Sequence, residues 1–109
     1  METWDIRSLA IEPHRPQVLR SDAESRAIAI HLPAGEELRE HQVHERTYMI
    51  VADGEVEVSQ RGDSVVGGPG LLSHFAPKER RTVRARSDAL LLLVLAPWPG
   101  EGHPSQRAA

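Results

Sequence analysis

The chain lacks cysteine entirely and has few aromatic residues. Its 109 residues include no Cys, which excludes disulfides, thiolate nucleophiles and cysteine-ligated zinc sites. Aromatic side chains make up only 4% of the sequence, so Val, Leu, Ile and Ala must fill the core. A chain of this length has room for one domain with one core.

Excess positive charge and long apolar runs are also missing. The formal net charge of -3 gives no general attraction to nucleic acid or to an anionic membrane. The longest apolar run, residues 89–97, is too short to span a bilayer. The first residues, METWDIRSL, lack the apolar core of a secretion signal. We therefore expect a cytoplasmic protein that binds neither nucleic acid nor membranes.

Short alternating segments separated by turn residues run through the rest of the chain. Their pattern predicts strands at residues 25–32, 47–52, 55–60, 64–66, 71–75, 82–86 and 89–95. Asp53-Gly54 predicts a tight hairpin between two of these strands. Short strands at about ten-residue spacing are typical of an antiparallel sandwich or barrel. We expect an N-terminal arm at residues 1–24, the β-domain at 25–96 and a Pro/Gly-rich tail at 97–109.

The alternation also assigns faces to the strands. Val83 and Ala85 face the core, which by the same parity turns Arg81 inward and Arg80 outward. The outer arginines of this strand have Glu55 and Glu57 as potential cross-strand partners. Residues 89–95 are apolar on both faces, and a chain this small has little but another subunit to cover the second face. We therefore expect a homodimer.

The glycine, histidine and proline spacing resembles that of a small single-domain cupin of the compact microbial type. The first cupin motif runs G, five residues, H-x-H, three or four residues, E, six residues, G, and Gly35, His41 and Gly54 fall on that spacing. The second motif begins at Gly70, with its proline one residue late at Pro77. The resemblance covers residues 25–96. It implies an all-β cupin jelly-roll β-barrel made of two facing antiparallel sheets.

Most ligand positions of the two cupin motifs hold other residues here. The second histidine of the first motif falls on Val43 and its glutamate on Thr47. The histidine of the second motif falls on Arg81, so only His41 is kept in place. A tightly held divalent metal needs three or four well-placed N or O ligands. The resemblance therefore implies either no cofactor or a weakly bound divalent metal.

The expected pocket lies inside the barrel. Its lining is predicted to be His41, Val43, Thr47, Met49, His74 and Arg81. The first hypothesis is a cupin-domain protein that binds a small polar or anionic molecule there, with a degenerate metal site. The alternative is a metal-dependent cupin oxygenase or isomerase whose metal is held by His41, His44 and His74. A third hypothesis is a structural or regulatory dimer with a closed pocket.

Two charged residues near this pocket each have two interpretations. An inward arginine must be paired or lie at a wet mouth, because an unpaired buried charge is very costly. Arg81 either grips an anionic ligand such as a carboxylate or forms an internal salt bridge with Glu45 or Glu79. Glu45 is either a substitute metal-binding carboxylate or a solvated loop charge.

Overall fold

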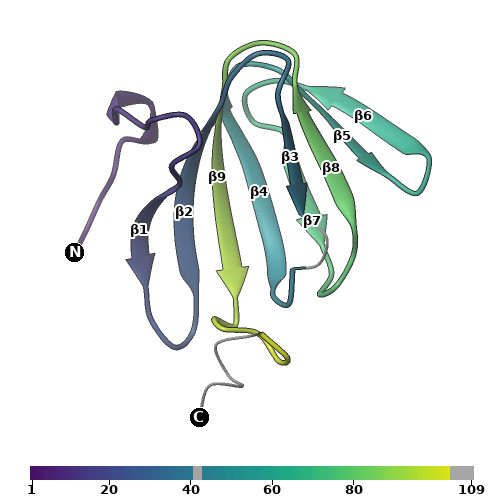
Figure 1. Cartoon of the computed structure of the whole chain (residues 1–109). Coiled ribbons are helices and arrows are strands. Elements are labelled where there is room, and N and C mark those ends of the chain that lie inside the picture. The colour runs from purple at the N-terminus through teal and green to yellow at the C-terminus, as the bar shows by residue number, and fades with distance from the viewer. Residues whose placement is uncertain (41–42, 104–109) are drawn as a thin grey trace.

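The fold consists almost entirely of strands. The computed structural model describes residues 1–40 and 43–103, without the side chains of Arg39 and Glu40. Its elements are the 3-10 helix η1 (Ile6–Ser8) and the strands β1 (Gln17–Ser21), β2 (Arg26–Leu32), β3 (Glu37–Glu40), β4 (Arg46–Asp53), β5 (Val56–Gln60), β6 (Asp63–Gly67), β7 (Leu72–Phe75), β8 (Arg81–Ala85) and β9 (Ala89–Ala96). Figure 1 shows their arrangement. In this part of the chain, no helix is long and apolar enough to cross a membrane.

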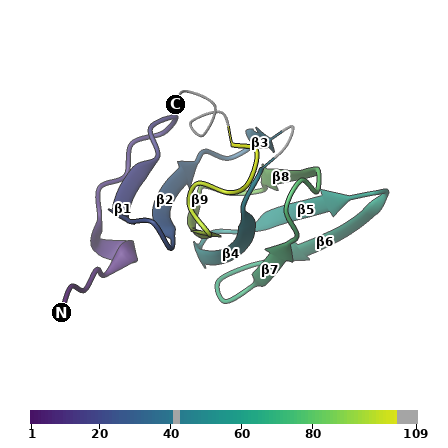
Figure 2. The same cartoon turned by 90° about the horizontal axis from the view of Figure 1, so that it is seen from below.

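The strands form two antiparallel sheets that face each other. One sheet has the order β1-β2-β9-β4-β7 and the other the order β3-β8-β5-β6. Figure 2 shows the two layers from below. The prediction of an all-β fold with two facing antiparallel sheets is confirmed. Over the described residues, however, the sheets form a sandwich and do not close into a barrel.

The core lies between the sheets and follows the alternation of the sequence. In β4, Thr47, Met49 and Val51 are buried, whereas Tyr48 and Ile50 between them face outward. A strand that alternates in this way covers the core with one face only. β8 and β9 alternate in the same way. The largest fully buried apolar side chains are Met49, Leu91, Leu93, Val51, Val56 and Val83.

Two strands were not expected from the sequence. β3 pairs with β8 in the register Glu37↔Arg84 and Leu38↔Val83, although its sequence ELRE has no β-branched or aromatic residue. β1 pairs with β2 inside the segment expected to be an N-terminal arm. Both segments become strands because they pair with neighbouring strands, and not because their own residues favour the extended conformation.

The Asp53-Gly54 turn differs from the expected hairpin. β4 pairs with β7 and β9, whereas β5 pairs with β6 and β8, so the turn carries the chain from one sheet to the other. Gly54 has φ +80°, and a Cβ there would lie 2.1 Å from the carbonyl oxygen of Asp88. Only glycine fits a corner with this backbone conformation and this close approach.

The outer face of the five-stranded sheet keeps apolar side chains at its surface. Tyr48 and Ile50 of β4 and Leu72 of β7 are exposed, with Leu72 at 58%. The register places Ile50 beside both Leu72 and Leu92 of β9. Leu92 and Val94 are half-buried. We refer to these five residues, Tyr48, Ile50, Leu72, Leu92 and Val94, as the outer apolar patch.

Candidate functional site

The inner wall of the sandwich carries polar side chains at the end where β4 begins and β9 finishes. Thr47 of β4 is fully buried and pairs in register with Phe75 of β7 and Leu95 of β9. Val43 and Met49 are buried on the same side of this segment. Thr47 Oγ1 donates a hydrogen bond to the backbone carbonyl of Glu45 (3.3 Å). Three of the predicted lining residues thus lie together in the core near this end.

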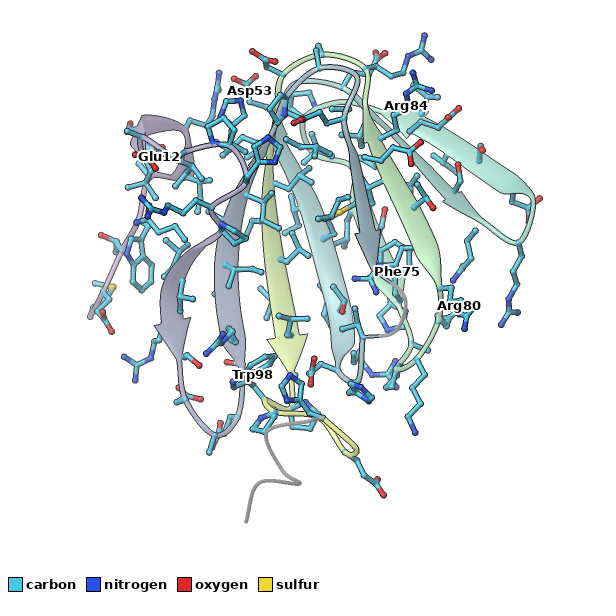
Figure 3. All side chains as sticks on the ribbon, viewed as in Figure 1. Glu12, Asp53, Phe75, Arg80, Arg84 and Trp98 are labelled. Carbon is cyan, nitrogen blue, oxygen red and sulfur yellow. The ribbon has the colours of Figure 1, made fainter. Side chains whose placement is uncertain are left out.

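Arg81, the first residue of β8, faces the same interior. Its side chain is on the buried row with Val83 and Ala85 and is only 7% exposed. Its guanidinium carbon lies 4.7 Å from the centre of the Phe75 ring, within range of a cation–π interaction. Arg80 is exposed and is labelled on the outside of the sandwich in Figure 3. The structure therefore places Arg81 inward and Arg80 outward, as the alternation of the sequence indicates.

The two carboxylates considered as partners for Arg81 are bound to other groups. Glu79 accepts hydrogen bonds from the Ala76 backbone N–H (2.6 Å) and from Gln60 Nε2 (2.8 Å). Glu45 Oε2 accepts the backbone N–H of Gly100 (2.6 Å). Each carboxylate thus has a structural role in a loop, in addition to its charge.

The solvated-loop interpretation of Glu45 is wrong, because its side chain is only 2% exposed. Residues 97–103, which we call the C-terminal segment, fold over it and supply the Gly100 N–H. From the sequence, this part of the chain is identified only as the start of a Pro/Gly-rich tail. Nothing in the sequence around Glu45 indicates this contact, because its partner Gly100 is 55 residues away along the chain.

His44 lies against the C-terminal segment. Its ring is half-buried and its Nδ1 is buried without a hydrogen-bond partner among the described residues. The ring centre lies 5.9 Å from that of His103 in an edge-on arrangement. His44 therefore borders the end of the sandwich and has the opposite parity to the inner row that contains Thr47.

His74 is on the outer face and does not line the interior, contrary to the expected pocket. It pairs with Tyr48 in register, and the two ring centres are 5.0 Å apart. Arg46 donates a hydrogen bond to His74 Nε2 (2.7 Å). The reason is strand parity: Phe75 takes the inward position of β7, so its neighbour must face outward.

The three histidines proposed as metal ligands are therefore not seen as one group. His41 lies outside the residues that the structure describes. His44 borders the C-terminal segment, and His74 lies on the outer face. Within residues 1–40 and 43–103, no group of three or more His, Asp or Glu side chains is arranged to hold a metal ion.

The outer arginines of the four-stranded sheet are matched by carboxylates, as expected from the sequence. Arg86 forms an ion pair with Glu55 (3.3 Å), and Arg84 lies opposite Glu57 in register. Arg84, labelled in Figure 3, points away from the sheets. A shallow cleft of about 350 Å³ beside them is lined by residues of both charges, which gives no continuous basic stripe.

Comparison with known proteins shows the fold. No protein-family model and no curated protein sequence match the chain. An RmlC-like cupin from Desulfovibrio desulfuricans superimposes with a TM-score of 0.77 at 17% identity, covering 89% of this chain and 97% of that one. An uncharacterised double-stranded β-helix protein from Klebsiella pneumoniae gives 0.76 at 18% identity, with 92% and 93% covered. A cupin-2 domain protein from Shewanella frigidimarina gives 0.70 at 13% identity, with 84% and 89% covered.

These similarities confirm the cupin fold that the motif spacing implies. At such low identity they establish the architecture and not an activity. The inner wall with Thr47, Phe75 and Arg81 is therefore the starting point for a functional hypothesis.

Proposed function

We propose that this cupin-fold protein binds a small organic anion, such as a carboxylic acid, at Arg81 on the inner wall of the sandwich. The observation that carries the proposal is the inward guanidinium, which is only 7% exposed. A guanidinium on the inner wall brings a fixed positive charge to the interior, and this charge favours an anionic ligand over a neutral one. A guanidinium offers a planar fork of N–H donors that matches the two oxygens of a carboxylate. The neighbouring Phe75 ring and Thr47 hydroxyl provide an apolar wall and a polar handle.

Isothermal titration calorimetry with matched pairs of ligands tests this proposal. We expect small mono- and dicarboxylates to bind at millimolar concentration or below, because their charge and shape fit the guanidinium. The corresponding uncharged amides have similar size and serve as the control. The proposal fails if none of the acids binds, or if the amides bind as well as the acids.

A resident metal does not fit the residues that the structure describes. Arg81 occupies the place of the histidine in the second cupin motif. Its fixed positive charge repels a cation, by about 4 kcal/mol for a unit charge at 4 Å near a protein surface. We expect protein expressed in metal-supplemented medium to retain well under one equivalent of divalent metal after dialysis, measured by elemental analysis. Retention of about one equivalent that is lost in His41→Ala would instead favour a metal-dependent oxygenase or isomerase.

We further expect the protein to form a homodimer through the outer apolar patch. Contiguous exposed apolar surface favours association, and symmetric dimers are the commonest closed assembly. Light scattering at micromolar concentration should give twice the chain mass of 12.1 kDa. Ile50→Glu should yield a monomer, whereas Val65→Glu, at an exposed strand position on β6 outside the patch, should remain dimeric. A monomeric wild-type protein would contradict this expectation.

A further inference from the structure

The C-terminal segment crosses the end of the sandwich beneath the inner wall. β9 finishes at Ala96, which pairs with Arg46 at the start of β4. Figure 1 shows the chain after β9 folding back below the ends of these two strands. Figure 3 shows Trp98 of this segment just below the end of β9. The segment therefore lies at the same end of the molecule as Thr47, which pairs with the next-to-last residue of β9.

One hydrogen bond fastens this segment to the body of the protein at a buried place. The Gly100 N–H donates to Glu45 Oε2 at 2.6 Å, and the carboxylate is 2% exposed. A hydrogen bond from a backbone N–H to a carboxylate oxygen is charge-assisted and is stronger than a hydrogen bond between two neutral groups. Glu45 precedes Thr47 by two residues, so the contact sits directly beside the inner wall.

Gly100 is seated so closely that no larger residue fits. A Cβ at this position would lie 2.2 Å from the carbonyl oxygen of His44 and 2.6 Å from its carbonyl carbon. Both are backbone atoms, which cannot move aside as the end of a flexible side chain does. Gly100 does not have a positive φ, so the close approach itself, and not the backbone conformation, requires glycine here.

Ring contacts hold the rest of the segment. The Arg26 guanidinium of β2 lies 4.1 Å from the centre of the Trp98 ring. The Trp98 ring lies 4.8 Å from that of His103, which in turn faces His44 at 5.9 Å. Trp98 and His103 are half-buried by these contacts. They fasten the segment on both sides of the buried hydrogen bond.

We propose that the C-terminal segment is a lid over the inner wall, with the Gly100–Glu45 hydrogen bond as its latch. In the closed form Thr47 is fully buried and Arg81 is 7% exposed. Release of the latch uncovers the end of the sandwich beside Thr47. Anion binding by the wall behind the lid rests on the function proposed above. The lid itself is tested without any ligand.

The absence of cysteine from the chain makes this test direct. Thr47→Cys places a single thiol behind the lid, and Ala85→Cys places one in the core at the opposite end of β8, where the side chain is also buried. The rate of reaction with Ellman's reagent then measures access to each end. Gly100→Ala is introduced into both proteins to force the latch open. Gly68→Ala is the matched control, because a Cβ there meets nothing nearer than 3.5 Å.

We expect Gly100→Ala to speed the labelling of Cys at position 47 about tenfold and to leave position 85 unchanged. Gly68→Ala should change neither rate. Equal acceleration at both positions would mean global loosening, and an unchanged rate at position 47 would mean that the segment is not a lid. Either result overturns the proposal. If Gly100→Ala does not fold, Trp98→Ala, which removes the contacts with Arg26 and His103, carries the same test with the same outcomes.

Failure of anion binding would be seen separately. If calorimetry finds no acid that binds while position 47 still becomes accessible on release of the latch, the lid stands and the proposed ligand class is wrong. If acids bind but the latch variant does not change access, the ligand class stands and the lid is wrong.

Discussion

Leu91→Ala is expected to destabilise the protein by about 2–5 kcal/mol. Leu91 is fully buried at the centre of β9 and lies in register between Ile30 of β2 and Val51 of β4, which are also buried. Shortening the side chain loses the favourable free energy of burying the removed methyl groups. It also leaves a cavity, because the close-packed neighbouring strands relax only partly into the space. Urea unfolding followed by circular dichroism measures the change in the free energy of unfolding.

The control for this substitution is Val65→Ala on β6. Val65 also loses apolar side-chain atoms but is 54% exposed and lies outside the outer apolar patch, so its cost should be under about 1 kcal/mol. A loss at Leu91 no larger than that at Val65 would contradict the assignment of the core between the two sheets.

Arg81→Gln is expected to abolish the stabilisation of the protein by small carboxylates. A ligand at about 100 times its dissociation constant stabilises a folded protein by about 2.7 kcal/mol, which in a domain of this size raises the melting temperature by on the order of 10 °C. Glutamine keeps a polar side chain of moderate length but loses the charge and the fork of donors. Thermal unfolding with and without the acid measures the effect.

Arg84→Gln is the control within the same strand. Arg84 lies on the outer face of β8, so its replacement should leave the shift caused by the acid intact. If both variants keep the full shift, the acid binds elsewhere. If both lose it, the effect is a general response to net charge and not recognition by the inner wall.

Sequence patterns predict the strands well where one face is buried. In β5 and β8, apolar residues at every second position make the inner row visible, and Arg81 falls on that row. β3 is different, because its four residues ELRE become a strand only by pairing with β8. The sheet change at Gly54 is also hidden, since a turn sequence of Asp and Gly looks the same in a hairpin as in a corner between sheets.

The site is harder to predict than the fold for two physical reasons. Residues 71–75, LLSHF, do not alternate between polar and apolar side chains, so the sequence does not show that Phe75 faces inward and His74 outward. Glu45 is buried by a segment more than fifty residues away in the chain, and no local pattern indicates that contact. Strand parity and long-range contacts therefore determine which charged groups reach the interior.

The most direct test of the central claim is a crystal structure of the protein saturated with the acid that calorimetry selects. We expect a carboxylate oxygen about 2.7–2.9 Å from a guanidinium nitrogen of Arg81, between the sheets and beside Thr47 and Phe75. An acid bound only on the outer surface, with Arg81 not in contact with it, would contradict the account.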